Sequence, residues 1–282
     1  MHPKIFQTLI LLIFLIANPF LGFCDEPPVE IPFKNPVQPP VETTDQIIER
    51  YNIALELNPE LAAGYYHRGK AYHAKGDLDL AIKDFDQLLI LSPSDAEAFN
   101  NRGSAYNDKG DFASAIKDFD KAIELDPIYS DAYYNRGLAY DDARDFDGAI
   151  IDFNKVLELN PSDAQAYNKR GSAFHDLGDF ANSIRDFNKA IELLPIYVEA
   201  YYNRGLTYYD KGDMEIAIKD FNKALEINPR FSWAYNNLGY IFLFKKNDHK
   251  TGCHYYEQAC MHGDCKLLNL VKQNGMCKEG PS

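Results

Sequence analysis

The feature of this sequence that most limits its fold is a period of 34 residues. Three columns keep this spacing: Pro59, Pro93, Pro127, Pro161, Pro195 and Pro229; Gly69, Gly103, Gly137, Gly171, Gly205 and Gly239; and the aromatic residues Tyr65, Phe99, Tyr133, Tyr167, Tyr201 and Tyr235. A period of this length is the signature of stacked supersecondary units. The chain is therefore an array of repeats, although its length of 282 residues alone would suggest two domains.

Each unit contains two helical patterns. Phe99, Gly103 and Tyr106 lie at positions i, i+4 and i+7, which places them on one face of a first helix, helix A. After a turn, Ala115 and Phe119 repeat the i, i+4 spacing in a second helix, helix B. A single unit would leave its rings in water, so the units must stack. The sequence predicts an all-α array.

The order of aromatic, Gly, Tyr, Ala, Phe, Ala and Pro within 34 residues resembles the tetratricopeptide repeat (TPR) family. The resemblance covers residues 62–265 and implies a right-handed superhelical solenoid of antiparallel helix pairs. It divides the folded part into a capping helix at residues 43–61, five units at residues 62–231, and a degenerate unit with a Cys-rich cap at residues 232–282.

The sixth unit departs from the pattern when it is read at the same spacing. Thr251 and Gly252 replace the usual Ala-Ile pair, and Tyr255 replaces the Phe of helix B. We therefore expect this unit to be a degenerate cap.

Charge and motifs restrict the functional classes. The net charge of -13 and the lack of a basic stripe argue against nucleic acid as a partner. The sequence contains no phosphate loop, nucleophile motif or zinc-protease motif, so no catalytic residue, cofactor or metal site is predicted. The resemblance implies a protein–protein interaction scaffold that binds an extended peptide or a partner protein in its concave groove. A column of aspartates favours a neutral or basic partner: Asp108, Asp142, Asp176 and Asp210.

One column of helix A carries the predicted peptide-binding residues. It holds Asn101, Asn135, Asn203 and Asn237, and Lys169 interrupts it. In related repeat superhelices an asparagine ladder lines the groove, and by this resemblance the row is expected to hydrogen-bond the backbone of a peptide. Tyr134 and Tyr202, in the adjacent column, are expected to add aromatic contacts. The alternative is that the Asn side chains bond to the neighbouring repeat.

Two further columns predict a structural ion pair. Arg68, Arg102, Arg136, Arg170 and Arg204 recur beside the glycine of helix A, and Asp84, Asp118, Asp152, Asp186 and Asp220 recur on helix B. Because a guanidinium fork matches a partly buried carboxylate, we expect each pair to bridge the two helices of its unit. Ligand binding by the Arg row is the alternative.

The N-terminus predicts export. The apolar run from Leu9 to Ala17, which Asn18 and Pro19 end, is typical of a secretory signal peptide at residues 1–24. A Pro-rich linker follows at residues 25–42. An uncleaved anchor over residues 5–23 and a lipid on Cys24 are alternatives. The predicted location is secreted, periplasmic or in the cell envelope.

Four cysteines cluster near the C-terminus. If residues 265–273 form a closing helix antiparallel to the one before, then Cys253 pairs with Cys277 and Cys260 with Cys265. Zinc bound by these thiols with His254 and His262 is the rival interpretation. The AC-x-x-GDC and NG-x-C pattern also resembles the endings of bacterial envelope repeat proteins.

Two other functions stay open at this point. A glycan or small-molecule receptor could be built at the Cys-rich end from Trp233, Tyr240 and Tyr255, although aromatic residues at helical spacing are more often core. An oligomerising structural scaffold is the other, and the sequence leaves the oligomeric state open.

Overall fold

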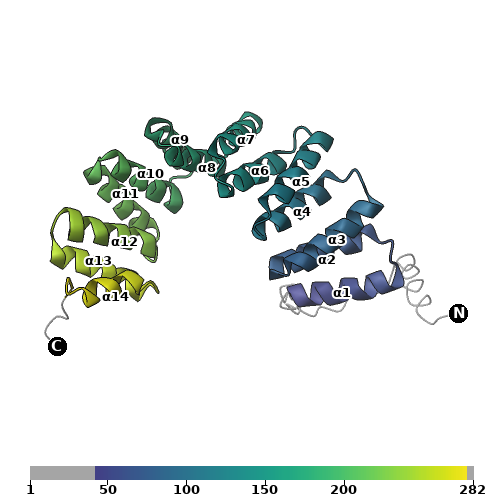
Figure 1. Cartoon of the computed structure of the whole chain (residues 1–282), viewed down its shortest axis with the longest axis horizontal. Helices are drawn as coiled ribbons and strands as arrows, with labels where there is room; N and C mark the ends of the chain where they lie inside the picture. Colours follow the sequence, from purple (N-terminus) through teal and green to yellow (C-terminus); the bar gives the residue numbers. More distant parts are fainter. Residues whose placement is uncertain (1–41, 278–282) are drawn as a thin grey trace, which may run out of the picture. The chain divides into compact units, whose positions relative to one another are not determined.

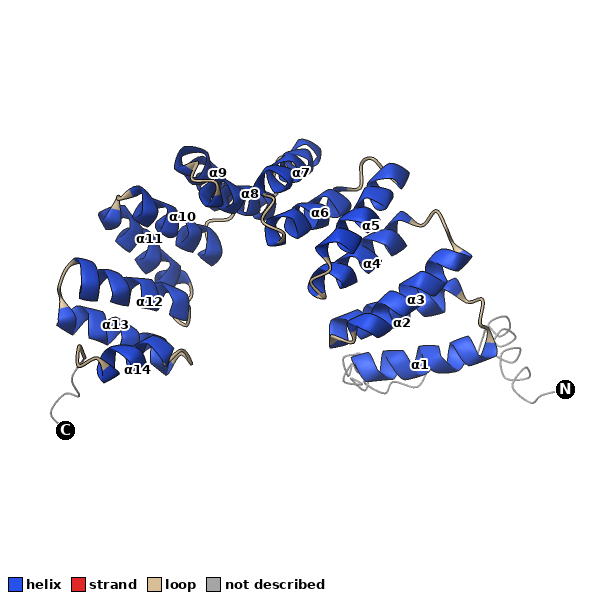
Figure 2. Cartoon of the chain, in the orientation of Figure 1, coloured by secondary structure: helices blue, strands red, loops and turns tan. Residues whose placement is uncertain are grey.

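The computed structural model describes residues 42–277, and within this range every regular element is a helix (Figures 1 and 2). The α-helices are α1 (Thr44–Leu57), α2 (Ala62–Lys75), α3 (Leu78–Leu91), α4 (Ala96–Asp108), α5 (Phe112–Leu125), α6 (Ser130–Asp142), α7 (Phe146–Leu159), α8 (Ala164–Asp176), α9 (Phe180–Leu193), α10 (Val198–Lys211), α11 (Met214–Ile227), α12 (Ser232–Tyr240), α13 (His249–Met261) and α14 (Lys266–Gln273). A π-helix, η1 (Ile241–Lys245), extends α12. The predicted all-α solenoid of helix pairs is confirmed.

The helices pack in chain order, and even-numbered α2 to α12 are the A helices of the repeats. Each A helix packs against the B helix that follows it, and each B helix packs against the next A helix. From α2 to α10, each A helix also packs against the next A helix. Within the described part of the chain, successive B helices do not pack against each other to the same extent. The A helices therefore form the inner side of the row. We call this side the inner face.

Short turns with a left-handed residue join helix A to helix B. Gly76, Gly110, Gly178 and Gly212 have φ between 78° and 97° at this turn, and Arg144 takes the same conformation in the third unit with φ 62°. Glycine suits this position because it lacks the Cβ that makes positive φ costly. An aspartate then begins helix B, as Asp111 does by accepting a hydrogen bond from the backbone N–H of Ser114.

A phenylalanine of helix B packs directly on the glycine of helix A in each regular unit. Phe85, Phe119, Phe153, Phe187 and Phe221 are 0–1% exposed. A Cβ added to Gly103 would lie 2.8 Å from Cε1 of Phe119, and one added to Gly137 would lie 2.9 Å from Cε1 of Phe153. The repeating glycine is therefore required by close approach of the ring, as the sequence indicates.

The sixth unit is more regular than the sequence predicts, and the predicted register is wrong by one residue. Tyr256, 2% exposed, packs on Gly239 as Phe221 packs on Gly205, a spacing of 17 residues instead of 16. The extra residue is absorbed by η1, since a π turn holds more residues than an α turn. Gly252 therefore matches the first Ala of helix B, and a Cβ added to it would lie 2.7 Å from the Cβ of Leu243.

The two ends of the row differ. At the N-terminal end α1 stands in the place of a helix B, and a Cβ on Gly64 would lie 2.8 Å from Cδ2 of Leu55. At the C-terminal end α14 packs on α13 in the position of a further helix A. The predicted signal peptide at 1–24, the anchor at 5–23, Cys24 and the linker at 25–42 lie outside the described residues, Glu42 excepted.

None of the helices between residues 42 and 277 has both the length and the apolar character that crossing a bilayer requires.

Candidate functional site

All seven predicted peptide-binding residues lie on A helices. Asn101 is on α4, Tyr134 and Asn135 on α6, Lys169 on α8, Tyr202 and Asn203 on α10, and Asn237 on α12. The 34-residue period repeats the same helical position in each unit, so the Asn column follows the inner face from one A helix to the next.

The amide nitrogens of three of these asparagines are used inside the chain. Nδ2 of Asn135 donates to Oδ1 of Asn100 at 2.9 Å, and Nδ2 of Asn203 donates to Oδ1 of Asn168 at 3.2 Å. Asn237 donates to the hydroxyl of Tyr202 at 3.0 Å. Each bond ties an A helix to the preceding one.

These bonds leave the amide oxygens without a hydrogen-bond partner in residues 42–277, so a ligand could still donate to Asn135 and Asn203. Asn101 differs, because its Nδ2 is buried and has no partner among the described residues. The row therefore combines a structural role with acceptor atoms that a peptide N–H could reach.

The two tyrosines of the site are half-buried. The ring of Tyr134 lies edge-on to Phe153 with centroids 5.7 Å apart, and Tyr202 packs between Phe221 and Phe231. Burial raises the pKa of Tyr134 to about 12, and burial also raises the pKa of Tyr202, against the hydrogen bond from Asn237. Both rings mainly fill the space between helices, and only their outer parts can contact a ligand.

Lys169 lies beside an acidic group of the preceding repeat. Burial raises the pKa of Asp141, the positive charge of Lys169 opposes this rise, and Asp176 and Asp142 add to it. The positive charge of Lys169 therefore favours the ionised form of Asp141.

The predicted Arg–Asp pairs are present in every regular unit. Nε and Nη2 of Arg102 donate to the two carboxylate oxygens of Asp118, both at 2.7 Å. The pairs of the other units are Arg68–Asp84, Arg136–Asp152, Arg170–Asp186 and Arg204–Asp220. The hydrogen bonds to Asp118 raise the pKa of Arg102. The Arg row therefore has the structural role that the sequence predicts.

The sequence did not reveal a third contact of each arginine. Nη1 of Arg102 donates to Asp86 of the preceding helix B at 2.6 Å, and Nη1 of Arg170 donates to Asn154 at 2.6 Å. Each guanidinium thus joins three helices. The signal was available, because Asn52, Asp86, Asp120, Asn154 and Asn188 form a further 34-residue column.

A second inter-repeat set of bonds runs along the C-terminal ends of the A helices. His73 contacts Asp108 at 2.8 Å, Asn107 donates to Asp142 at 3.0 Å, and His175 lies 3.3 Å from Asp210. Sequence reasoning identified only the aspartates of these pairs. The carboxylates are nonetheless exposed, so their charge acts on the solvent side of the inner face.

A small hollow opens on the inner face between α8, α9 and α10. It has a volume of about 230 Å³ and is lined by Ser172, His175, Asp176, Phe187, Asn203 and Leu206. Its lining combines apolar and polar side chains, which suits one side chain of a bound peptide.

Family comparisons agree with this arrangement. Models described as tetratricopeptide repeat match residues 130–163, 198–231 and 221–254, and one described as TPR repeat matches residues 69–108, 103–142 and 171–212. Together these matches cover more than half of the chain. The chain belongs to the tetratricopeptide repeat family.

Solved TPR structures resemble it over most of their own length. A crystal structure of MamA is 32% identical, covers 57% of this chain and 95% of that chain, and has a TM-score of 0.53. YrrB, described as a TPR protein with an unusual peptide-binding site, is 27% identical, covers 66% and 96%, and has a TM-score of 0.54.

A TPR protein from Parabacteroides merdae ATCC 43184, 23% identical with coverage of 82% and 90% and a TM-score of 0.66, shares the fold. No curated protein matches this sequence.

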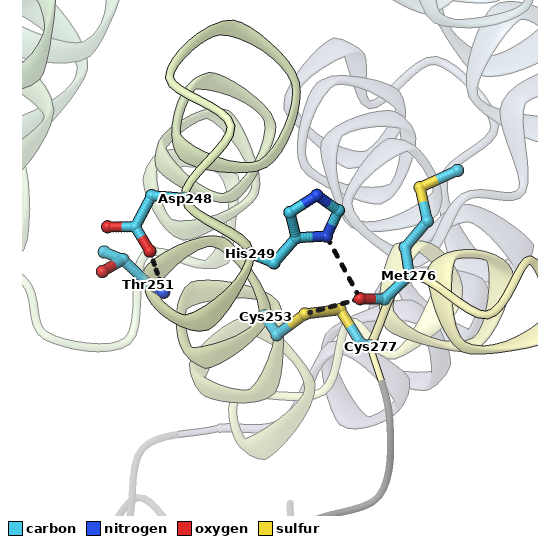
Figure 3. Close-up of a disulfide and its surroundings, with 6 residues drawn as sticks. All are labelled: Asp248, His249, Thr251, Cys253, Met276 and Cys277. Atoms are coloured by element: carbon cyan, nitrogen blue, oxygen red, sulfur yellow. Dashed lines mark hydrogen bonds between the residues drawn. A yellow bond between two sulfur atoms is a disulfide. The ribbon is translucent and has the colours of Figure 1, made fainter.

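The last TPR unit places the four cysteines in the predicted pairs. Cys253 on α13 lies beside Cys277, with Cα atoms 5.6 Å apart, and Cys260 lies beside Cys265, with Cα atoms 4.0 Å apart. Figure 3 shows the first pair beside His249 and Met276. Residues 42–277 contain no cluster of three or more His, Cys, Asp or Glu side chains suited to a metal ion.

The aromatic residues proposed for a glycan site do not meet. Tyr255 packs between Tyr235 and Phe242, against the buried core of the last TPR unit. Trp233 and Tyr240 instead lie exposed on α12. A hollow of about 600 Å³ does exist at this end, but its lining is His249, Lys250, Cys253, His254, Glu257, Gly275 and Met276.

Proposed function

We propose that this TPR protein binds an extended, basic segment of a partner protein along its inner face, and that it acts by binding and not by catalysis. The fold is that of a protein–protein interaction scaffold. The similarity to YrrB, a TPR protein with an unusual peptide-binding site, supports the same class of ligand.

One observation carries the proposal: two acidic columns run along the inner face on either side of the Asn row. The columns consist of Glu97, Asp131 and Glu199 near the starts of the A helices and Asp108, Asp142, Asp176 and Asp210 near their ends, and all seven side chains are exposed. An extended basic segment placed between the columns would meet carboxylates on both sides.

The Asn row and the hollow would add backbone and side-chain recognition. The free amide oxygens of Asn135 and Asn203 can accept from peptide N–H groups. The hollow beside Asn203 can receive one side chain of the segment. Each hydrogen bond would contribute only about 0.5 to 1.5 kcal/mol net to the binding free energy. The carboxylates must therefore supply a large share of the affinity.

The proposed location is the cell envelope or outside the cell. It is supported by the apolar run of residues 9–17 in a predicted signal peptide and by cysteine pairs, which persist in oxidising compartments. Cell fractionation with a tagged chain tests it, and recovery in the cytosol would contradict it.

The binding proposal is tested by selecting displayed random peptides on the immobilised chain and measuring affinity by calorimetry. We expect basic peptides, an affinity that falls as salt rises, and a loss of about tenfold for Asp131→Asn combined with Glu199→Gln. Both side chains are exposed and form no hydrogen bond with residues 42–277, so this variant should fold normally.

Asn135→Ala combined with Asn203→Ala should also weaken binding about tenfold, because two acceptors are lost. Asn269→Ala, on the exposed surface of α14, is the matched control and should bind normally. A thermal melt separates lost acceptors from lost inter-repeat bonds. Peptides without basic residues, or binding that neither double variant weakens, would refute the inner face as the site.

A further inference from the structure

The exposed face of the last helix A is aromatic. Trp233, Tyr240 and Phe244 lie at i, i+7 and i+11 on α12 and η1, and they are 59%, 40% and 45% exposed. Tyr240 lies 5.2 Å from Phe244 and 6.3 Å from Tyr209 of α10, between ring centroids. We call Trp233, Tyr240 and Phe244 the aromatic face.

The aromatic face continues the inner face, because Tyr240 contacts Tyr209 and Asn237 on the same helix donates to Tyr202. Trp233 stands where Glu97, Asp131 and Glu199 stand in earlier units. Phe244 lies in η1, the segment that absorbs the extra residue of this unit, at the C-terminal end of the helix where earlier A helices carry Asp108, Asp142, Asp176 and Asp210. An aromatic ring therefore stands near each end of α12 and η1, where the earlier A helices carry acidic side chains.

Packing within the unit does not account for these rings. Tyr202 and Phe231 contact Trp233, yet more than half of its surface stays in water. The buried core of the unit is made by Leu238, Ile241 and Tyr256 instead. Clustered exposed aromatic side chains are typical of the central anchors of protein interfaces.

The charges around the aromatic face indicate which kind of ligand it binds. The acidic columns lead up to the aromatic face, and Lys245 lies 5.7 Å from the ring of Tyr240 at its border. We infer that the aromatic face holds a large apolar side chain, aromatic or aliphatic, that stands at one end of the basic segment of the partner. This inference rests on the proposed function, and it gives the ligand a composition: basic residues followed or preceded by an apolar anchor.

Trp233 reports on this contact directly, because it is the only tryptophan of the chain. Peptides selected on the full chain are titrated while the Trp emission and its quenching by acrylamide are recorded. We expect a blue shift and reduced quenching. We also expect affinity to fall about tenfold for Tyr240→Ser or Phe244→Ser, and about tenfold when the apolar residue of the peptide is replaced by Ser.

Ile151→Ser is the matched control, because Ile151 is 66% exposed on α7, a helix B; it should leave affinity unchanged.

If peptides bind without moving the Trp emission and tolerate Tyr240→Ser, but need Asp131 and Glu199, the inference is overturned and the proposed function stands. If no peptide is selected, both are overturned. If the emission shifts on concentrating the chain alone, and light scattering finds a dimer that Phe244→Ser removes, a second copy is the occupant and the inference is wrong.

Discussion

In the regular repeats, from α2 to α11, an Arg–Asp pair links the helices in addition to the buried Phe ring, whereas the unit formed by α12 to α14 lacks this pair and adds two cysteine pairs to its buried rings. An Arg–Asp pair links helices A and B in each regular repeat, but Leu238 and Tyr255 stand in those places in the last unit, and Leu238 is fully buried. A regular repeat has a neighbour on both sides that supplies partners for its polar groups. In residues 42–277 the last unit has α14 beyond it instead of a further helix pair, so apolar contacts and cysteine pairs stabilise it.

The largest effect is expected from removing a ring in a regular repeat. Phe187→Ala should lower the free energy of unfolding by about 3 to 5 kcal/mol, because it opens a cavity under Gly171. Urea unfolding followed by circular dichroism measures this loss. Ile151→Ala, at an exposed site, should cost no more than about 0.5 kcal/mol. Equal losses for the two variants would show that the Phe column is not the core.

Removing the cysteine pairs should affect only the last unit. Cys253→Ser with Cys277→Ser should destabilise α13 and α14 by about 3 kcal/mol, and Cys260→Ser with Cys265→Ser by about 2 kcal/mol, because their sequence separations are 24 and 5. Amide hydrogen exchange measures the loss of stability helix by helix, and the exchange rates of α5 to α8 should be unchanged. Non-reducing peptide mass spectrometry comes first, and a Cys253–Cys265 peptide would contradict the pairing.

A smaller loss should follow a change of the arginine that joins three helices. Arg136→Lys keeps the charge but loses the two-pronged bond to Asp152, for an expected cost of about 2 kcal/mol in unfolding free energy. Arg230→Lys is the control, because Arg230 is exposed in the loop before α12. If both variants melt alike, the guanidinium network contributes nothing to stability and the contrast with the last unit is lost.

The smallest effect concerns the helix caps that both regions share. Hydrogen bonds from the backbone and side chain of Asn182 lower the pKa of Asp179, and the bonds from Thr251 lower the pKa of Asp248. A pKa below the unfolded value means that the charged cap stabilises above about pH 4 and is lost as pH falls through the folded pKa. The melting temperature of Asp179→Asn should therefore change less than that of the parent between neutral pH and about pH 3. An unchanged pH profile would contradict the shift.

Much of the fold could be predicted from the sequence because it is periodic. The Gly and Phe columns and the Arg–Asp pairs follow from residue spacing alone, since the contact repeats wherever the residues repeat. The register of the sixth unit could not be predicted in the same way. Reading at 34 residues aligned Tyr255 with Phe221, and only the backbone shows that η1 absorbs one residue and brings Tyr256 there.

The candidate site was harder to predict, for a different reason. The spacing identifies which helix position Asn135 and Asn203 occupy, but the direction of a side-chain amide depends on its partners in the folded state. Asn100 and Asn168 provide those partners, and they lie in the same column as Tyr134 and Tyr202. The exposure of Trp233 and Tyr240 was also undetectable, because helical spacing suits core and surface alike.

The third hydrogen bond of each arginine has a consequence for how the array melts. Nη1 of Arg68, Arg102, Arg136, Arg170 and Arg204 reaches back to the helix before its own repeat, from Asn52 to Asn188. If one unit unfolded, the guanidinium or its acceptor in the neighbouring unit would lose its hydrogen-bond partner. Unfolding from either end should therefore cost free energy at every boundary between units. In nearest-neighbour terms the coupling between units is strong, and the regular repeats should come apart as one long cooperative block.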